Sequence, residues 1–218
     1  MSENMGLSFS YKNYLPGISD EQIEKLIQFK EIFLDWNTRI NLISRKDTEL
    51  FEVKHVLHSL SIAKFIRFNP GARVLDLGTG GGFPGIPLAI LFPEAQFILA
   101  DSIEKKMKVV SDLVEQLGLK NVMVKRGRVE EMDIEVDYVL SRAVASMSDI
   151  IHWTRDKIIS GQVGSMPNGW LVLKGGDLSE ELGFYRKSVE IQKINDYWKD
   201  EFFETKLIIY LARQIIWF

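Results

Sequence analysis

The feature that most constrains the fold is a glycine-rich turn that follows a short apolar run. Residues 74–87 read VLDLGTGGGFPGIP, with five glycines among the eight positions 78–85. Pro84 and Pro87 indicate that a helix begins here, because proline is tolerated in the first turn of a helix and not further in. A strand, a glycine-rich turn and a helix N-terminus form a nucleotide site, because a ligand can approach bare backbone with free N–H donors. The stretch therefore predicts an α/β fold with a ligand at this turn; a tight turn without a ligand is the alternative.

The chain downstream alternates between apolar strands and helical segments. Helices are predicted from Pro84, over Ile103–Leu117 with Gly118 closing it, and over Met147–Ile159. Continuous apolar strands between helices are typical of a mostly parallel sheet that is covered on both faces. The seven predicted strands are RVLDL (73–77), QFILAD (96–101), NVMVK (121–125), YVLSRA (138–143), WLVLKG (170–175) and, as two closing strands, KSVEIQKI (187–194) and TKLIIYLA (205–212).

The N-terminal part of the chain has a helical pattern. Between Ser19 and Leu42 apolar residues recur every three or four positions, which predicts an amphipathic helix. Ser19 and Gln22 form a capping-box pair at its start. A second helix is predicted with Asp47 as its N-cap, and the stretch NPGA (69–72) ends it. We therefore expect a helical extension over residues 1–70 and one compact domain over residues 71–218.

The composition excludes several classes of protein. The 218 residues include no cysteine, which excludes disulfides, thiolate metal sites and a cysteine nucleophile. The net charge of −3 argues against non-specific coating of nucleic acid and leaves room for a local basic patch. His55, His58 and His152 lack the spacing of metal ligands, so no metal site is predicted. Because no stretch has the length of a membrane span and the N-terminus lacks a secretory signal, we expect a cytoplasmic protein with no membrane association.

The glycine-rich turn fits two ligand-binding patterns. Gly80 to Gly85 matches the dinucleotide pattern G-x-G-x-x-G. Asp76 to Gly82 instead gives an acidic residue at a strand end followed by G-x-G-x-G, formed by Gly78, Gly80 and Gly82. That second pattern is the one found in methyltransferases that use S-adenosyl-L-methionine (SAM). SAM has no pyrophosphate for the turn to cradle, and the Asp76 carboxylate suits its amino group, directly or through water.

Two acidic segments downstream favour a nucleoside ligand. Asp101 ends the second predicted strand, where an acid accepts hydrogen bonds from ribose hydroxyls; capping of the helix that starts at Ile103 is the alternative. The segment RGRVEEM (126–132) follows the third strand, where methyltransferases recognise adenine with a backbone N–H and an acidic side chain. Val129 and Glu130 are placed for that contact, with a solvated charged loop as the alternative. Together with Asp76, this segment favours SAM over a dinucleotide.

Several motifs together resemble one family. The motifs LDLGTGGGFPGIPLAI, DS..KK, GRVEE, SRAVAS and LKGG occur in the order and spacing of the RsmG (GidB) family of 16S ribosomal RNA guanine-N7 methyltransferases. The upstream stretches WNTRINLIS and VKHVLHSL also resemble this family, so the similarity covers about residues 30–176. It implies a class I SAM-dependent methyltransferase fold, Rossmann-like, with an N-terminal helical extension. SAM is the implied cofactor, and 16S rRNA or the small ribosomal subunit is the implied partner.

The resemblance also implies roles for individual residues. The implied SAM contacts are Gly78, Phe83, Val129, Glu130 and Arg142. The implied functional basic residues are Lys105, Arg128, Arg142 and Lys174. The chain departs from the family in two places. His58 stands where the family usually has Asp, and the C-terminus RQIIWF is apolar where the family usually has a short basic tail.

The residues present also restrict the reaction. Methylation of pyrimidine C5 needs a cysteine nucleophile, and exocyclic amines are typically methylated at an N/D-P-P-Y/F turn, where this chain has Ser141-Arg142-Ala143. Guanine N7 has an in-plane lone pair and no proton to remove, so it needs only alignment and exclusion of water. Together with the resemblance to the RsmG family, this leads us to interpret the chain as a SAM-dependent methyltransferase acting on guanine N7 of small-subunit rRNA, with Arg142 positioning cofactor or substrate. We expect it to be a monomer. The alternatives are a dehydrogenase using the Gly80–Gly85 turn and a SAM- or RNA-binding accessory protein without catalysis.

Overall fold

The computed structural model describes residues 9–215, so the last three residues of the apolar C-terminal stretch lie outside the described residues. One seven-stranded sheet forms its centre, with the order β3-β2-β1-β4-β5-β7-β6. Strands β1 to β5 run parallel, and β7 is antiparallel to both of its neighbours. The bounds are β1 Arg73–Leu77, β2 Gln96–Asp101, β3 Val122–Arg126, β4 Tyr138–Arg142, β5 Gly169–Gly175, β6 Glu190–Lys193 and β7 Lys206–Ala212. The mostly parallel seven-stranded sheet is confirmed.

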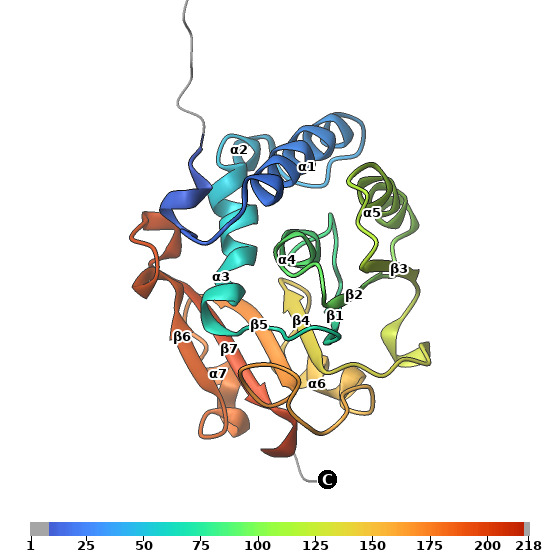
Figure 1. The fold of residues 1–218 in the computed structure, drawn as a ribbon. Helices are drawn as coiled ribbons and strands as arrows, with labels where there is room; N and C mark the ends of the chain where they lie inside the picture. The colour runs from blue at the N-terminus through green and yellow to red at the C-terminus, as the bar shows by residue number, and fades with distance from the viewer. Residues whose placement is uncertain (1–8, 216–218) are drawn as a thin grey trace, which may run out of the picture.

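Helices cover both faces of this sheet (Figure 1). One face packs against α1 (Asp20–Arg39), α3 (His58–Phe65), α4 (Gly85–Leu91) and α5 (Glu104–Gln116). The opposite face packs against α6 (Met147–Thr154) and α7 (Ser179–Leu182). The strand order reverses at β1, since β2 follows on one side and β4 lies on the other. Ligands of open α/β sheets bind beyond the carboxyl ends of the strands at such a switch point.

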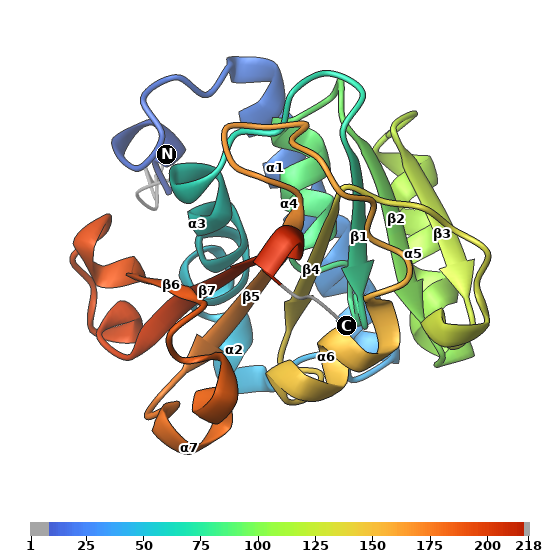
Figure 2. The same ribbon diagram turned by 90° about the horizontal axis from the view of Figure 1, so that it is seen from below.

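The N-terminal extension packs directly on the glycine-rich turn. Phe83, from the turn, lies 5.3 Å from both Phe29 and Phe33 and 5.8 Å from Phe51, measured between ring centroids. A Cβ atom built on Gly81 would lie 2.6 Å from Cε2 of Phe33. The extension therefore shares one hydrophobic core with the sheet and covers it on the side of α4 (Figure 2).

The first predicted helix is confirmed together with its capping box. The backbone N–H of Gln22 donates to Oγ of Ser19 at 3.2 Å, and the backbone N–H of Ser19 donates to Oε1 of Gln22 at 3.0 Å. The Gln22 side chain also donates to the carbonyl oxygens of Ile90 and Leu91, which end α4. The capping residues thus fix both the start of α1 and its position against the sheet.

Replacing Ser19 with alanine is expected to lower the free energy of unfolding by about 1 kcal/mol, because one N–H of the first turn loses its acceptor. For a chain of this size, that corresponds to a decrease in Tm of about 2–4 °C. Thermal unfolding followed by circular dichroism measures it. Ser160→Ala, at an exposed loop position, is the matched control. Equal Tm values for the two variants would contradict a structural role for the capping box.

Two predicted helix boundaries are wrong. Asp47 is not an N-cap: Ser44 caps α2 (Arg45–Thr48) by accepting from the backbone N–H of Asp47, and Asp47 lies in the first turn. The next segment, Glu52–Leu57, is a π-helix that continues into α3. Helix α6 ends at Thr154 and not at Ile159, because the chain turns there so that the buried Ile158 can form a parallel bridge with Val136.

None of the helices within residues 9–215 combines the length and the apolar character that crossing a membrane requires.

Candidate active site

A cavity of about 340 Å³ lies at the carboxyl ends of β1, β2 and β4. Its wall is formed by the glycine-rich turn, the end of β2, the segment after β3 and the segment after β4. The lining includes Gly78, Asp101, Lys106, Arg128, Val129, Glu130, Val144 and Trp153. Gly127 joins two of these segments, because its backbone N–H donates to the carbonyl oxygen of Asp101 at 3.1 Å.

The Asp76 side chain stabilises the glycine-rich turn by hydrogen bonds. Its side chain is completely buried, and Oδ2 accepts from the Thr79 hydroxyl at 2.6 Å and from the backbone N–H of Gly85 at 2.8 Å. Burial raises the pKa of this carboxyl to about 6. Oδ1 is buried and has no hydrogen-bond partner among the described residues. The structure thus gives Asp76 a role in shaping the turn, and the predicted contact with the SAM amino group stays a prediction.

The turn has a backbone conformation that suits glycine. Gly78, Gly80 and Gly82 have φ angles of 66°, 58° and 97°. A Cβ atom on Gly80 would have only one neighbour within 4 Å, the carbonyl oxygen of Gly78 at 3.9 Å, so this glycine faces open space. Gly78 is different, because a Cβ there would lie 2.4 Å from Cγ2 of Val144. The turn is therefore open at Gly80 and is covered at Gly78 by the segment after β4.

Asp101 accepts two backbone hydrogen bonds. Its Oδ1 accepts from the backbone N–H of Ile103 at 2.8 Å. Ile103 is itself the N-cap of α5, which has no side-chain cap, so Asp101 stabilises the turn before this helix and the predicted capping role is wrong. Its Oδ2 accepts from the backbone N–H of Gly80 at 3.1 Å, which ties the glycine-rich turn to β2. The residue also lines the cavity, where its carboxylate has remaining lone pairs for a ribose diol.

Replacing Asp101 with alanine is expected to weaken SAM binding by about 1.5–3 kcal/mol, the range for hydrogen bonds to a charged group. Isothermal titration calorimetry measures this directly. Asp177→Ala is the matched control, because Asp177 also accepts from a backbone N–H two residues ahead but is exposed outside the cavity. Unchanged SAM affinity in a folded Asp101→Ala protein would limit Asp101 to its two backbone contacts, with Gly80 and Ile103.

The other side of the cavity comes from the segment after β3. Val129 is buried at the start of a 3₁₀ turn (Val129–Glu131), whereas Arg128 and Glu130 are exposed at the cavity rim. From α5, Lys106 lines the cavity, and the predicted Lys105 is exposed but does not line it. Sequence reasoning missed Lys106, because the motif DS..KK does not say which of its two lysines faces the cavity.

Lys174 is not a free cation in this structure. At the end of β5 its Nζ pairs with Oε1 of Glu181 at 2.7 Å and donates to the carbonyl oxygen of Ala145 at 2.5 Å. The same Glu181 oxygen accepts from the backbone N–H of Met147, which begins α6. Lys174 therefore holds the segment between β4 and α6, and Glu181 neutralises its charge.

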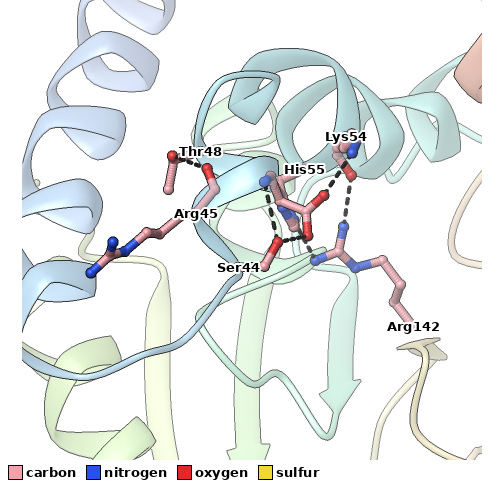
Figure 3. Close-up of polar contacts among 7 residues, drawn as sticks. Ser44, Arg45, Thr48, Lys54, His55 and Arg142 are labelled. Atoms are coloured by element: carbon pink, nitrogen blue, oxygen red, sulfur yellow. Dashed lines mark hydrogen bonds and ion pairs between the residues drawn. The ribbon is translucent and has the colours of Figure 1, made fainter.

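Arg142, at the end of β4, reaches into the N-terminal extension (Figure 3). Its Nη1 donates to the carbonyl oxygen of Lys54 at 3.2 Å, and its Nη2 lies 3.2 Å from Nδ1 of His55. The guanidinium carbon lies 4.8 Å from the centroid of the Phe83 ring, a cation–π distance. Burial lowers the pKa of Arg142 to about 10, so it remains charged at neutral pH. The residues Lys54 and His55 were not predicted to take part in the site.

The residues present fit SAM. The cavity at the switch point is lined by the backbone of Gly78, by Asp101 at the end of β2, and by Val129 and Glu130 after β3. The other predicted cofactor residues do not line it: Asp76, Gly80, Gly82, Phe83 and Arg142. This fold and this site define a class I SAM-dependent methyltransferase.

Solved structures have the same fold. A SAM-dependent O-methyltransferase from Thermotoga maritima has a TM-score of 0.56 at 17% identity, covering 76% of this chain and 70% of its own. A SAM-dependent methyltransferase from Aquifex aeolicus has a TM-score of 0.54 at 14% identity, and the match covers 78% of this chain and 98% of that chain.

Sequence comparison gives the family. The model of the family GidB, rRNA small subunit methyltransferase G, matches residues 22–208. The ribosomal RNA small subunit methyltransferase G of Christiangramia forsetii is 50% identical over 200 residues, covering 92% of this chain and 94% of that protein. The protein of the same name from Flavobacterium johnsoniae is 48% identical over 198 residues, and the match covers 91% of this chain and 94% of that protein. The chain therefore belongs to the rRNA small subunit methyltransferase G family and is a SAM-dependent rRNA methyltransferase, which excludes the dehydrogenase alternative.

Proposed function

We propose that this protein transfers the methyl group of SAM to N7 of a guanine in 16S rRNA. The observation that carries the proposal is the cavity at the carboxyl ends of β1, β2 and β4, which offers nucleoside-binding groups on one side and exposed basic side chains at its rim. The segment Ser141-Arg142-Ala143 at the carboxyl end of β4 contains no side chain suited to remove a proton, and guanine N7 has none to lose. SAM supplies an electrophilic methyl group, so the protein needs to align the base and exclude water.

We assign the cofactor roles as follows. The backbone of Gly78, Gly80 and Gly82 would contact the methionine half of SAM, and Asp101 would accept from the ribose hydroxyls. Val129 would offer its backbone N–H to adenine, and Glu130 its carboxylate. Phe83 supports the site from within the core, where its ring packs against the Arg142 guanidinium. We further propose that the protein works as a monomer in the cytoplasm.

The position of methylation can be tested chemically. We expect SAM with a radiolabelled methyl group to label 16S rRNA or the small ribosomal subunit. Borohydride and aniline treatment should then cleave the labelled RNA at one guanine, because only an N7-alkylated ring becomes that labile. A label on a ribose or an exocyclic amine would contradict the N7 assignment but would not contradict SAM as the cofactor. Absence of transfer despite SAM binding would favour the non-catalytic accessory protein.

RNA contacts at the cavity rim can be tested by salt dependence. Replacing Arg128 with alanine is expected to lower the slope of log affinity against log salt by about 0.7–0.9, because one phosphate contact is lost. SAM affinity should stay nearly unchanged. Lys64→Ala is the matched control: it removes the same charge from an exposed position in α3 that does not line the cavity. Filter binding of rRNA at several salt concentrations measures both slopes, and equal slopes would exclude Arg128 as a phosphate contact.

A further inference from the structure

A second cavity, the extension cavity, lies between the last turns of α1 and the short helix α2. Its lining residues fall between positions 34 and 48, and its volume is about 790 Å³. That volume is within the range of about 300–1,000 Å³ that is typical of ligand sites. The lining is mostly polar and includes Arg39 and Arg45, whereas no Asp or Glu within residues 9–215 lines it. The extension cavity is therefore complementary in charge to an anionic ligand.

Asn37 gives this cavity a fixed wall by holding the loop between α1 and α2. Its Oδ1 accepts from the backbone N–H groups of Leu42 at 2.8 Å and Ile43 at 2.9 Å. Its Nδ2 donates to the carbonyl oxygen of Ile43 at 3.2 Å. A loop that is already hydrogen-bonded loses little conformational freedom when a ligand binds, which favours binding.

Arg45, the first residue of α2, is a cation of this lining without a partner. The residue is exposed, and its guanidinium forms no hydrogen bond or ion pair within residues 9–215. Figure 3 shows the guanidinium pointing away from Ser44 and Lys54. The neighbouring Asp47 is occupied, because it accepts from the Ser44 hydroxyl and pairs with the ammonium of Lys54, both at 2.6 Å. The five N–H donors of Arg45 are therefore free for a ligand.

Arg39, the last residue of α1, adds a second guanidinium. Its Nη2 pairs with Oδ2 of Asp35 at 2.5 Å, and its guanidinium carbon lies 5.3 Å from the centroid of the Trp36 ring. Both members of this ion pair are exposed, so the pair contributes little energy and leaves Arg39 able to bind an anion as well.

The extension cavity lies at the same end of the molecule as the candidate active site. Figure 2 shows α2 at the end of the sheet toward which the parallel strands point, where α6 also lies. Lys54 connects the two cavities. Its ammonium pairs with Asp47 of α2, and its carbonyl oxygen accepts from Arg142 at the end of β4. The next two residues, Ala143 and Val144, line the active-site cavity, so an RNA chain bound there can extend to the extension cavity.

We propose that the extension cavity binds a segment of the rRNA that flanks the target guanine, with Arg45 contacting a backbone phosphate. This inference rests on the proposed function, since it takes rRNA to be the substrate. The net charge of −3 means that the protein must hold a polyanion through local cationic groups. An arginine matches a phosphate with two parallel hydrogen bonds, and the polar lining around it can bind sugar hydroxyls. The N-terminal extension would then hold the substrate as well as cover the sheet.

The first test compares two neighbouring cations. Arg45→Ala is expected to weaken binding of 16S rRNA, free or in the small ribosomal subunit, about 10-fold, because a charge-assisted contact is lost. The slope of log affinity against log salt should decrease by about 0.7–0.9. Lys46→Ala is the matched control, because it removes the same charge from an exposed position of the same helix that does not line the cavity. Filter binding at several salt concentrations measures both, and equal slopes for the two variants would overturn the inference.

Methylation kinetics separate this inference from the proposed function. Arg45→Ala should raise KM for rRNA about 10-fold and leave kcat unchanged, because the contact is made equally in the ground state and the transition state. SAM affinity, measured by calorimetry, should stay unchanged. Wild-type KM in this variant would contradict the inference alone. Absence of methyl transfer by the wild-type protein would contradict the proposed function, and the salt slopes would still decide whether RNA occupies the extension cavity.

The second test locates the RNA on the protein. Because the chain contains no cysteine, Thr38→Cys places a single thiol at the extension cavity, and Ile27→Cys places one at an exposed position of α1 outside it. Saturating 16S rRNA should protect the first thiol from alkylation by N-ethylmaleimide and leave the second reactive, since alkylation requires access to the thiol. Equal alkylation rates of the two thiols, whether both are protected or both react, would overturn the inference.

Discussion

Replacing Asp76 with asparagine is expected to abolish a pH dependence of stability that the wild-type protein shows between about pH 4 and pH 6. Burial raises the pKa of this carboxyl from 3.8 to about 6. In that interval the folded protein holds a proton that the unfolded chain has lost, so stability decreases as pH rises. The loss is about 3 kcal/mol, since a difference of one pKa unit corresponds to 1.36 kcal/mol. Below pH 4 the carboxyl is protonated in both states and the loss is absent. Urea unfolding at pH 4.5 and pH 7 measures the difference between variant and wild type.

The same substitution is expected to weaken SAM binding at least 10-fold at pH 7. Asparagine can still accept from Thr79 and Gly85, so the turn keeps its shape while the negative charge beneath it disappears. Cations bind better to the ionised carboxyl, so wild-type affinity for SAM should fall as pH decreases below about 6, and the variant should not follow. Asp137→Asn is the control, because Asp137 is also buried but lies at the amino end of β4, away from the carboxyl ends of the strands where the cavity lies. Equal SAM affinity for wild type and Asp76→Asn would show that Asp76 acts through hydrogen bonds alone.

The parallel strands were predictable because most of them are continuous apolar runs between helical segments, a pattern that can be recognised from the local sequence. The predicted strand 96–101 coincides with β2, and Asp101 ends it as expected. The glycine-rich turn could also be located, since so many glycines before a proline have few other structural explanations. The N-cap of the second helix was wrong for a local reason. Both Ser44 and Asp47 are good capping residues, and only the fold shows that Ser44 accepts from the N–H of Asp47.

The environment of the charged residues was not predictable from the sequence. Lys174 and Arg142 both lie at the carboxyl ends of strands, and the same reasoning predicted both as basic site residues. The structure separates them, because Lys174 meets Glu181 from α7 and Arg142 meets neutral groups from the extension. Such pairings depend on residues distant in the sequence, and no local pattern reports them. The contact between His55 and Arg142 was missed for the same reason: the two residues lie 87 positions apart, and the π-helix that contains His55 cannot be recognised from the spacing of apolar residues.

Three glycine-to-alanine substitutions are expected to separate the cost of close packing from the cost of a positive φ angle: Gly85 at the start of α4, Gly118 after α5 and Gly17 before α1. At Gly85 a Cβ atom would lie 2.1 Å from Cδ2 of Leu99 and 2.7 Å from Oδ2 of Asp76. At Gly118 nothing lies within 4 Å, but the φ angle is 61°, and at Gly17 there is neither a neighbour nor a positive φ. Gly85→Ala should therefore cost about 3 kcal/mol or more, from overpacking and from displacement of the Asp76 contact. Gly118→Ala should cost about 1 kcal/mol, and Gly17→Ala about zero.

The same three variants separate stability from cofactor binding. Gly118 and Gly17 lie outside the cavity, so both alanine variants should bind SAM like the wild type once folded. Gly85→Ala should lose SAM binding even at a temperature where it is folded, because Leu99 and Asp76 must move and Asp76 holds the turn through Thr79. Thermal unfolding gives the stability order, and calorimetry well below the Tm of the weakest variant gives the affinities. If Gly85→Ala were less stable but bound SAM normally, the Asp76 contacts would serve folding only, and the turn could shape the cofactor site without them.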